Sequence, residues 1–143
     1  MGLCLMNSRK MMKNSKCRGE WAELQFMAKA AKFGLRILKP WGETARYDMV
    51  IDNGGRLVRV QIKSTMHFTS EGCYVCGVRP CKTSKPYRRG EFDFFAVYII
   101  PEDVWYIIPA KIVVHGKRSG IRLYTSRPTG KYEAYREAWD LLR

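Results

Sequence analysis

The chain has 143 residues, of which 46% are hydrophobic and 27% charged; this composition excludes a largely disordered protein and predicts one globular domain. Twenty-six lysines and arginines against 13 acidic residues give a formal net charge of +13 and a sequence pI near 9.8. Such an excess of positive charge indicates a polyanionic partner, for which nucleic acid is the first candidate.

The rest of the composition favours a reduced, cytoplasmic protein. The longest apolar run, residues 94–100, is far shorter than the roughly 20 residues that span a bilayer, so we expect no contact with a membrane interior. The five cysteines are an odd number, which fits free thiols better than a closed disulfide framework. Residues 1–15 lack the pattern of a signal peptide and are expected to form a basic, flexible tail before a single domain at 16–143.

The first expected element is an amphipathic helix at 16–34, which Gly34 ends. Its apolar residues recur at three- and four-residue spacing, and we expect them to form the buried stripe: Trp21, Leu24, Ala28, Ala31 and Leu35. A short strand at 35–39 follows, and Pro40 ends it.

A β-hairpin is predicted next, because Asn53-Gly-Gly-Arg56 is typical of a tight turn between two strands, 47–52 and 57–63. In the second strand Val58 and its alternate neighbours are apolar, whereas Arg59, Gln61 and Lys63 face the other way.

The remaining elements alternate between apolar strands and polar connections. Residues 79–90 hold two prolines and five basic residues and predict a basic loop. The other expected elements are strands at 73–78, 94–100, 104–108 and 121–124 and a closing helix at 132–142. The fold class is therefore α/β, with a mixed central sheet flanked by helices.

The hairpin also carries the residues with the clearest chemistry. If its loop has two residues, Asp48 lies opposite Arg59 when the loop is Asn53-Gly54, or opposite Gln61 when the loop is Gly54-Gly55. Either register places Asp48 on the same face as Gln61 and Lys63. A carboxylate, an amide oxygen and a cation can hold a metal ion and stabilise the charge that develops when a phosphodiester is hydrolysed.

At these residues the chain resembles the PD-(D/E)xK nucleases. Asp48 followed by Gln61-Ile62-Lys63 is similar to the group I intron-associated branch, in which Gln stands at the acidic position. Upstream, Arg18-Gly19 followed by Glu23 resembles the start of the first helix in Holliday-junction resolvases, and Ser64 also fits the resolvase-like pattern. Residues 93–98 and 104–109 extend the resemblance, which covers about 16–142.

The resemblance implies a restriction-endonuclease-like fold and a DNA endonuclease that needs Mg²⁺, with Mn²⁺ as a substitute. It implies metal ligation by Glu23, Asp48 and Gln61, catalysis by these residues with Lys63, and products with 5′-phosphate and 3′-hydroxyl ends. Two-strand cleavage with one site per chain predicts a homodimer or a higher homo-oligomer. The departures are Tyr47 in place of proline and neutral Gln61, which contributes no charge to a metal site.

Several alternatives stay open at this point. A nuclease scaffold with Gln61 can also be an inactive nucleic-acid-binding module, and within the enzymes a homing endonuclease competes with a junction resolvase. Cys73, Cys76 and Cys81 have a spacing that suggests zinc, but free thiols fit better because strand alternation separates the first two. Glu20 and Asp52 are expected to serve the helix start and the turn rather than the metal.

The basic loop is the predicted DNA-binding element. Its cations suit phosphates and its aromatic ring suits stacking. The residues assigned to it are Lys82, Lys85, Tyr87, Arg88 and Arg89. Trp41, in the loop before the hairpin, is a further candidate for DNA contact.

Overall fold

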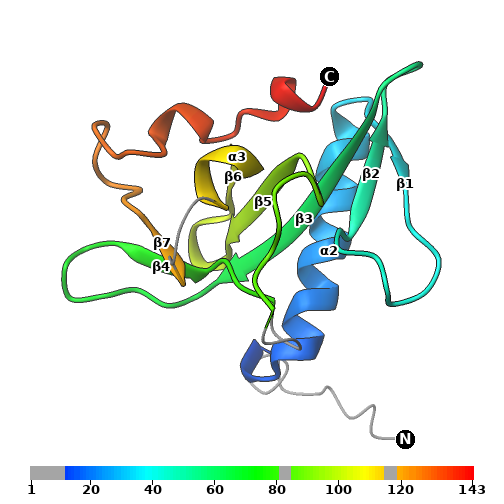
Figure 1. Ribbon diagram of the computed structural model, residues 1–143. Helices are drawn as coiled ribbons and strands as arrows, with labels where there is room; N and C mark the ends of the chain where they lie inside the picture. The colour runs from blue at the N-terminus through cyan, green and yellow to red at the C-terminus, as the bar shows by residue number, and fades with distance from the viewer. Residues whose placement is uncertain (1–11, 81–84, 115–118) are drawn as a thin grey trace, which may run out of the picture.

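The computed structural model describes residues 12–80, 85–114 and 119–143 (Figure 1). Its helices and strands follow the predicted order closely. They are α2 (Ser15–Lys32), β1 (Arg36–Leu38), β2 (Met49–Asp52), β3 (Leu57–Thr65), β4 (Tyr74–Gly77), β5 (Phe94–Ile99), the 3₁₀ helix η1 (Ile100–Glu102), β6 (Val104–Pro109), α3 (Ala110–Val113), β7 (Gly120–Leu123) and the 3₁₀ helices η2 (Glu133–Tyr135) and η3 (Trp139–Leu142). Most of the expected flexible tail, residues 1–11, lies outside the described residues.

Five strands form a mixed sheet in the order β1-β2-β3-β5-β6, which confirms the predicted α/β fold class. β3 and β5 are parallel, and the other neighbours in this sheet are antiparallel. A parallel pair needs a long crossover, and the chain between Thr65 and Phe94 provides it. That crossover contains β4, which pairs with β7 in a separate two-stranded sheet, and the predicted basic loop.

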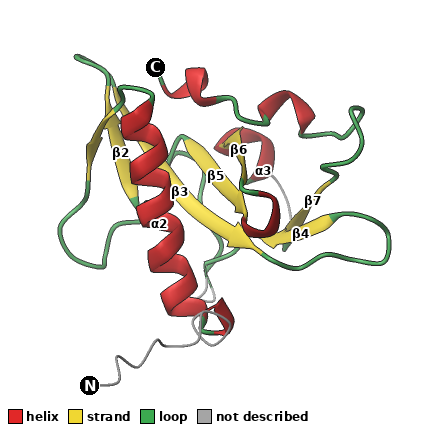
Figure 2. Ribbon diagram, turned by 180° about the vertical axis from the view of Figure 1, so that it is seen from behind, coloured by secondary structure: helices red, strands yellow, loops and turns green. Residues whose placement is uncertain are grey.

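Helix α2 covers one face of the sheet, in front of β2 and β3 in Figure 2. Asn14 caps its start by accepting hydrogen bonds from the backbone N–H groups of Lys16 at 3.0 Å and Cys17 at 3.2 Å. At its end Gly34 has a φ of 73°, a left-handed conformation that glycine adopts without strain.

The predicted apolar stripe of α2 is wrong at its centre. The buried residues are Ala22, Phe26 and Ala30, whereas Leu24 is 58% exposed and Ala28 and Ala31 are also exposed. Two rows on one helix share the same spacing, so spacing alone does not decide which row faces the sheet. The small-large-small row lets the helix approach the sheet closely while Phe26 fills the space between them.

Two hydrophobic cores lie on the two faces of the sheet. On the α2 face, Phe26 packs against Trp105 and Trp139 with ring centroids 5.6 and 5.4 Å apart. The opposite face is covered by β4, β7 and the short α3, so helices flank the sheet unequally. Alternation along β5 supplies both cores, and all six of its residues are buried.

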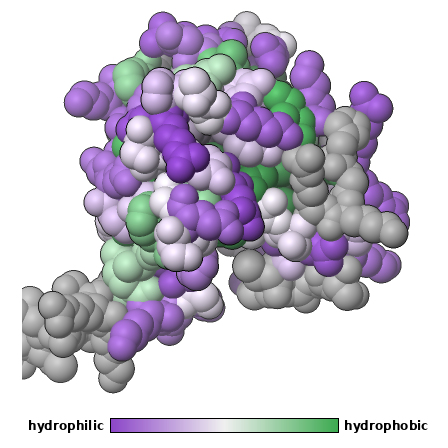
Figure 3. Space-filling model, turned by 90° about the vertical axis from the view of Figure 1, so that its left-hand side faces the viewer, coloured by the Kyte–Doolittle hydropathy of each residue, from purple (hydrophilic) through white to green (hydrophobic). Residues whose placement is uncertain are grey.

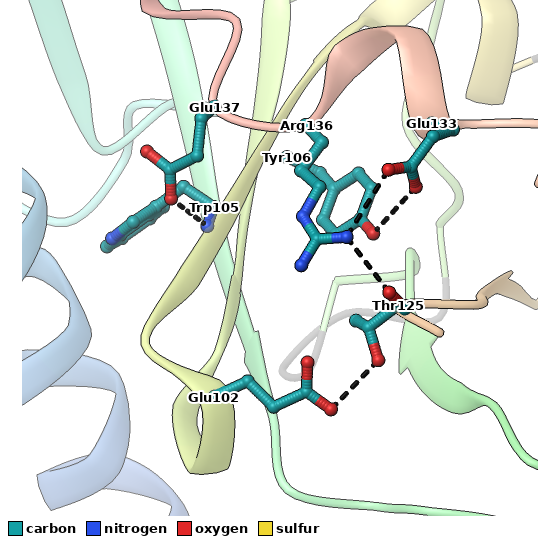
Figure 4. A network of polar contacts seen from close by, with 7 residues as sticks. All are labelled: Glu102, Trp105, Tyr106, Thr125, Glu133, Arg136 and Glu137. Carbon is teal, nitrogen blue, oxygen red and sulfur yellow. Dashed lines mark hydrogen bonds and ion pairs between the residues drawn. The ribbon is translucent and has the colours of Figure 1, made fainter. Parts of the chain in front are cut away.

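The chain after β7 crosses the edge of the sheet at β6 instead of forming the helix predicted at 132–142 (Figure 4). Glu137 has a φ of 49°; its backbone N–H donates to the Trp105 carbonyl at 2.7 Å, and its carboxylate accepts from the Trp105 N–H at 2.9 Å. The neighbouring Arg136 pairs with Tyr106 in a β-bridge. A continuous helix would leave these edge groups of β6 without partners, so the extended conformation is favoured.

The surface is mainly hydrophilic on the side that carries β4 and β7, with apolar side chains in small groups (Figure 3). Within the described residues, no helix is both long enough and apolar enough to cross a membrane.

Candidate active site

The β2–β3 hairpin has the register in which Gly54 and Gly55 form the turn. Asp52 pairs with Leu57 and Met49 with Val60, so the same register places Asp48 opposite Gln61. Gly54 and Gly55 have φ values of 72° and 146°, which the tight turn requires and other residues rarely adopt.

Asp48 lies where β2 begins, and its carboxylate is bound to β3. Its Oδ2 accepts hydrogen bonds from the backbone N–H of Ile62 at 2.7 Å and from Gln61 Nε2 at 2.6 Å. Its own backbone N–H donates to the Val60 carbonyl at 2.9 Å. The side chain of Gln61 is therefore oriented by Asp48, and Gln61 is only 8% exposed.

The pKa of Asp48 is raised to about 6, mainly by burial of its carboxylate and to a smaller extent by the nearby carboxylate of Glu23. The hydrogen bond from Ile62 and the charges of Lys63 and Lys39 lower the pKa, but they offset only part of the burial. A carboxylate that is desolvated and close to a second carboxylate is stabilised by an added cation, which is the electrostatic condition of a metal site.

Glu23 reaches the same cleft from α2. Its carboxylate forms an ion pair with Lys39, and its side chain remains 25% exposed. Glu23, Asp48, Gln61 and Lys63 all line one cleft of about 640 Å³, between the first half of α2 and the ends of β2 and β3. The structure thus brings all four predicted catalytic residues together, and their roles stay predictions.

Lys63 contacts the basic loop at two places, one before and one after residues 81–84, which the structure does not describe. Its Nζ donates to the Arg79 carbonyl at 3.2 Å and lies 5.6 Å from the centre of the Tyr87 ring. Burial raises the pKa of Tyr87, and the positive charge of Lys63 offsets only part of this rise, so the phenol stays protonated at neutral pH.

Tyr87 is less available for DNA stacking than the sequence suggests. Its ring meets Phe92 and Phe95 edge-on, with centroids 4.9 and 5.8 Å apart, and Arg46 covers it at 4.9 Å. The other predicted DNA-binding residues of the described loop, Lys85, Arg88 and Arg89, are exposed. Lys82 lies outside the described residues, so its predicted role has no structural counterpart.

Two basic residues close to the predicted metal ligands were missed by the sequence interpretation. Arg46 lines the cleft and bridges two segments, because its guanidinium pairs with Glu91 at 3.3 Å and donates to the Pro86 carbonyl at 3.4 Å. Lys39, which follows β1, reaches Glu23 and the neighbourhood of Asp48. Neither residue belongs to a recognisable motif, and only the tertiary fold brings them to the cleft.

The donor set of the cleft fits a hard divalent cation. Two carboxylates and an amide oxygen, from Glu23, Asp48 and Gln61, are the oxygen ligands that Mg²⁺ prefers. Among residues 12–80, 85–114 and 119–143 there is no cluster of three or more histidine, cysteine or acidic side chains suited to a metal. Cys73 and Cys76 are buried free thiols, as expected, and Cys81 lies outside the described residues.

A mixed sheet with an Asp, a Q-x-K strand and a helix glutamate around one cleft defines a restriction-endonuclease-like nuclease. Residues 13–142 match the family model described as PD-(D/E)XK endonuclease. The chain belongs to the PD-(D/E)XK endonuclease family, which confirms the predicted resemblance. Enzymes of this family generally use divalent metal ions.

The structure is also similar to that of the bacterial homing endonuclease I-Ssp6803I. The two sequences are 30% identical, the match covers 90% of this chain and 91% of the other, and the TM-score is 0.75. No curated protein sequence matches the chain. The DNA endonuclease predicted from the sequence is thereby supported at the level of family and fold.

Proposed function

We propose that this chain is a Mg²⁺-dependent endodeoxyribonuclease of the homing type, with Mn²⁺ able to substitute. The observation that carries the proposal is the convergence of Asp48, Gln61, Lys63 and Glu23 in one cleft. The similarity to a homing endonuclease over nine-tenths of both chains favours homing-type cleavage of duplex DNA over junction resolution.

Each residue has a role that its position supports. Asp48, Glu23 and the Gln61 amide oxygen would hold the metal ion. A divalent ion, when bound, supplies Lewis-acid activation of water and of the scissile phosphate. Lys63 orients the attacking water by hydrogen bonding, and its fixed positive charge stabilises the pentavalent phosphate in the transition state. The cleavage leaves a 5′-phosphate and a 3′-hydroxyl.

The arrangement of the neighbouring groups prepares this chemistry. Gln61 is locked by Asp48 at 2.6 Å, so its amide needs little reorganisation. Lys63 is fixed by the Arg79 carbonyl and Tyr87, which limits the conformational entropy lost when DNA binds. We also propose a homodimer, because cutting both strands of a duplex with one site per chain calls for two chains.

The second candidate is a DNA-binding module that has lost cleavage. Neutral Gln61 favours this candidate, because it removes one negative charge from the metal site. In addition, Lys39 forms an ion pair with Glu23 and so competes with a metal ion for the Glu23 carboxylate.

Nicking and linearisation of supercoiled plasmid, in Mg²⁺ and in Mn²⁺, distinguishes the candidates. We expect Lys63→Ala and Asp48→Ala to abolish cutting, while Lys32→Ala, which removes an exposed cation of α2, cuts like the wild type. Wild type that binds DNA without cutting a library of duplex targets would favour the module. Equal cutting by all variants would refute the assigned site.

Two further measurements refine the assignment. A four-way junction tested in parallel reports on resolvase activity, and preference for it over every duplex would overturn the homing type. Calorimetry should detect Mg²⁺ binding by wild type and lose it in Asp48→Ala. The expected cytoplasmic location stays a prediction that the free thiols Cys17, Cys73 and Cys76 support.

A further inference from the structure

A second hollow, separate from the catalytic cleft, lies beside the start of β5 and the end of β6. It encloses about 420 Å³, and no residue lines both this hollow and the cleft. The residues around it are Arg56, Arg89, Gly90, Phe92, Asp93, Phe94, Pro109, Ala110, Lys111 and Val114.

Three cations from different elements surround this hollow. Arg56 comes from the β2–β3 turn, Arg89 from the basic loop and Lys111 from α3, and all three are exposed. In the part of the chain that the structure describes, none of these three side chains takes part in a hydrogen bond or an ion pair.

The acidic groups nearby are already neutralised. The Asp93 carboxylate accepts from the Arg59 backbone N–H at 2.7 Å and pairs with the Arg59 guanidinium at 3.2 Å. The Glu91 carboxylate accepts from Arg46 at 3.3 Å and from the Arg88 backbone N–H at 2.9 Å. The hollow therefore presents three positive charges that no carboxylate of its own balances, which favours an anionic ligand.

The position of the hollow relates it to the catalytic cleft. Arg59, whose guanidinium engages Asp93 at its wall, points to the same face of β3 as Gln61 and Lys63. The basic loop lies between the hollow and the catalytic cleft, because Tyr87 lines the cleft whereas Arg89 lines the hollow. Gln61 lies five positions along the chain from Arg56, which in extended conformation is a span of roughly 17 Å.

We propose that this basic hollow binds backbone phosphates of the DNA that flanks the scissile bond. The inference rests on the proposed nuclease function. Each strand of B-DNA places one phosphate about every 3.4 Å along the axis, so a span of roughly 17 Å corresponds to about five base pairs. Arg56 and Arg89 suit phosphate oxygens because a guanidinium can donate two hydrogen bonds to one phosphate group.

The hollow contributes affinity and register rather than chemistry. Its cations contact phosphates, which are common to every sequence, so they hold the duplex while other contacts read the bases. Removing them should weaken binding to all sequences alike.

The test compares the triple variant R56Q/R89Q/K111Q with the charge-matched control K32Q/R127Q/K131Q, which removes three exposed cations elsewhere. DNA binding is measured in Ca²⁺ over a range of salt concentrations, and thermal melting verifies that both proteins are folded. We expect the slope of log K against log salt to fall by about 2 to 3 for the triple variant, from about 0.9 per phosphate contact. The control should keep a slope within about 1 of wild type.

A second readout locates the contact on the DNA. Neutral methylphosphonate linkages about five base pairs from the cleavage site should weaken binding of wild type several-fold and of the triple variant by less than twofold. Equal slopes for triple variant and control, or equal sensitivity of wild type and triple variant to the neutral linkages, would overturn the proposal. Binding in Ca²⁺ needs no cleavage, so a protein that shows the expected salt slopes without cutting would refute the nuclease but keep the hollow as a phosphate-binding site.

Discussion

Replacing Asp48 with asparagine should stabilise the metal-free protein at neutral pH while it abolishes cleavage. The pKa of Asp48 is raised from 3.8 to about 6, mainly because its carboxylate is buried. A group whose pKa is raised in the folded state stabilises the fold below the unfolded pKa and loses that contribution as the pH rises through the folded pKa. The ionised Asp48 is therefore a destabilising group above about pH 6.

The size of the effect follows from the two pKa values. The difference between a pKa of 3.8 in the unfolded chain and about 6 in the folded protein corresponds to about 3 kcal/mol of unfolding free energy at pH 7.5, but to only about 1 kcal/mol at pH 4.5. Asparagine keeps an acceptor for the Ile62 N–H, although it loses the added strength of a charged acceptor. We expect a net gain of about 1–2 kcal/mol at pH 7.5, or about 3–7 °C in melting temperature.

The assay is thermal unfolding of wild type and Asp48→Asn in a chelator at pH 4.5 and 7.5, with Asp140→Asn as control because Asp140 is 93% exposed. The stabilisation by Asp48→Asn should grow by up to about 2 kcal/mol between the two pH values. Added Mg²⁺ should then stabilise wild type and leave Asp48→Asn unchanged, because binding to the folded state alone raises stability. A lower melting temperature for Asp48→Asn at pH 7.5, or a difference from wild type that does not change with pH, would refute the reasoning.

Three further predictions concern contacts around the cleft and the core. Tyr87→Leu removes the ring beside Lys63 and should lower the single-turnover cleavage rate about tenfold while DNA affinity stays within twofold of wild type, whereas Tyr87→Phe should keep most of the rate. Equal losses in affinity and rate would show that Tyr87 is only a DNA contact. Lys39→Gln frees Glu23 and should tighten Mg²⁺ binding in calorimetry about two- to tenfold, and weaker binding would contradict the competition inferred from the ion pair. Glu137→Ala leaves the Trp105 N–H and the Trp139 indole N–H without their acceptor and should cost about 2–4 kcal/mol in urea unfolding, against less than about 0.5 kcal/mol for the exposed Glu20→Ala.

The sequence predicts the parts of the fold that depend on local patterns. Alternation along residues 57–63 and the Asn-Gly-Gly turn specify the hairpin, and the structure selects the second of the two registers that the turn allowed. The C-terminal segment differs because its conformation depends on distant partners. Trp139 and Leu142 have helical spacing and are buried, but Glu137 hydrogen-bonds to the edge of β6, an interaction that no pattern within 132–142 reveals.

The candidate site also combines residues that local sequence patterns predict with residues that only the tertiary fold brings together. Asp48, Gln61 and Lys63 were predicted to share a face because they lie on one hairpin with a period of two, and the cleft contains all three. Arg46 and Lys39 come from connections whose course is set by packing, so the position of Arg46 in the cleft and of Lys39 beside Glu23 was not predictable. The same holds for Tyr87, where the composition of the loop suggested a free ring and the packing against Phe92 and Phe95 buries most of it.

The way in which the sheet ends limits how two copies of this chain can assemble. One edge strand, β1, has only three residues and is followed by Pro40, which has no N–H to donate, so it offers little backbone for strand addition. The other edge strand, β6, has backbone groups of Trp105 and Tyr106 paired with Glu137 and Arg136. The proposed homodimer therefore requires contacts through side chains rather than one continuous sheet, and the same two features protect the fold against edge-to-edge aggregation.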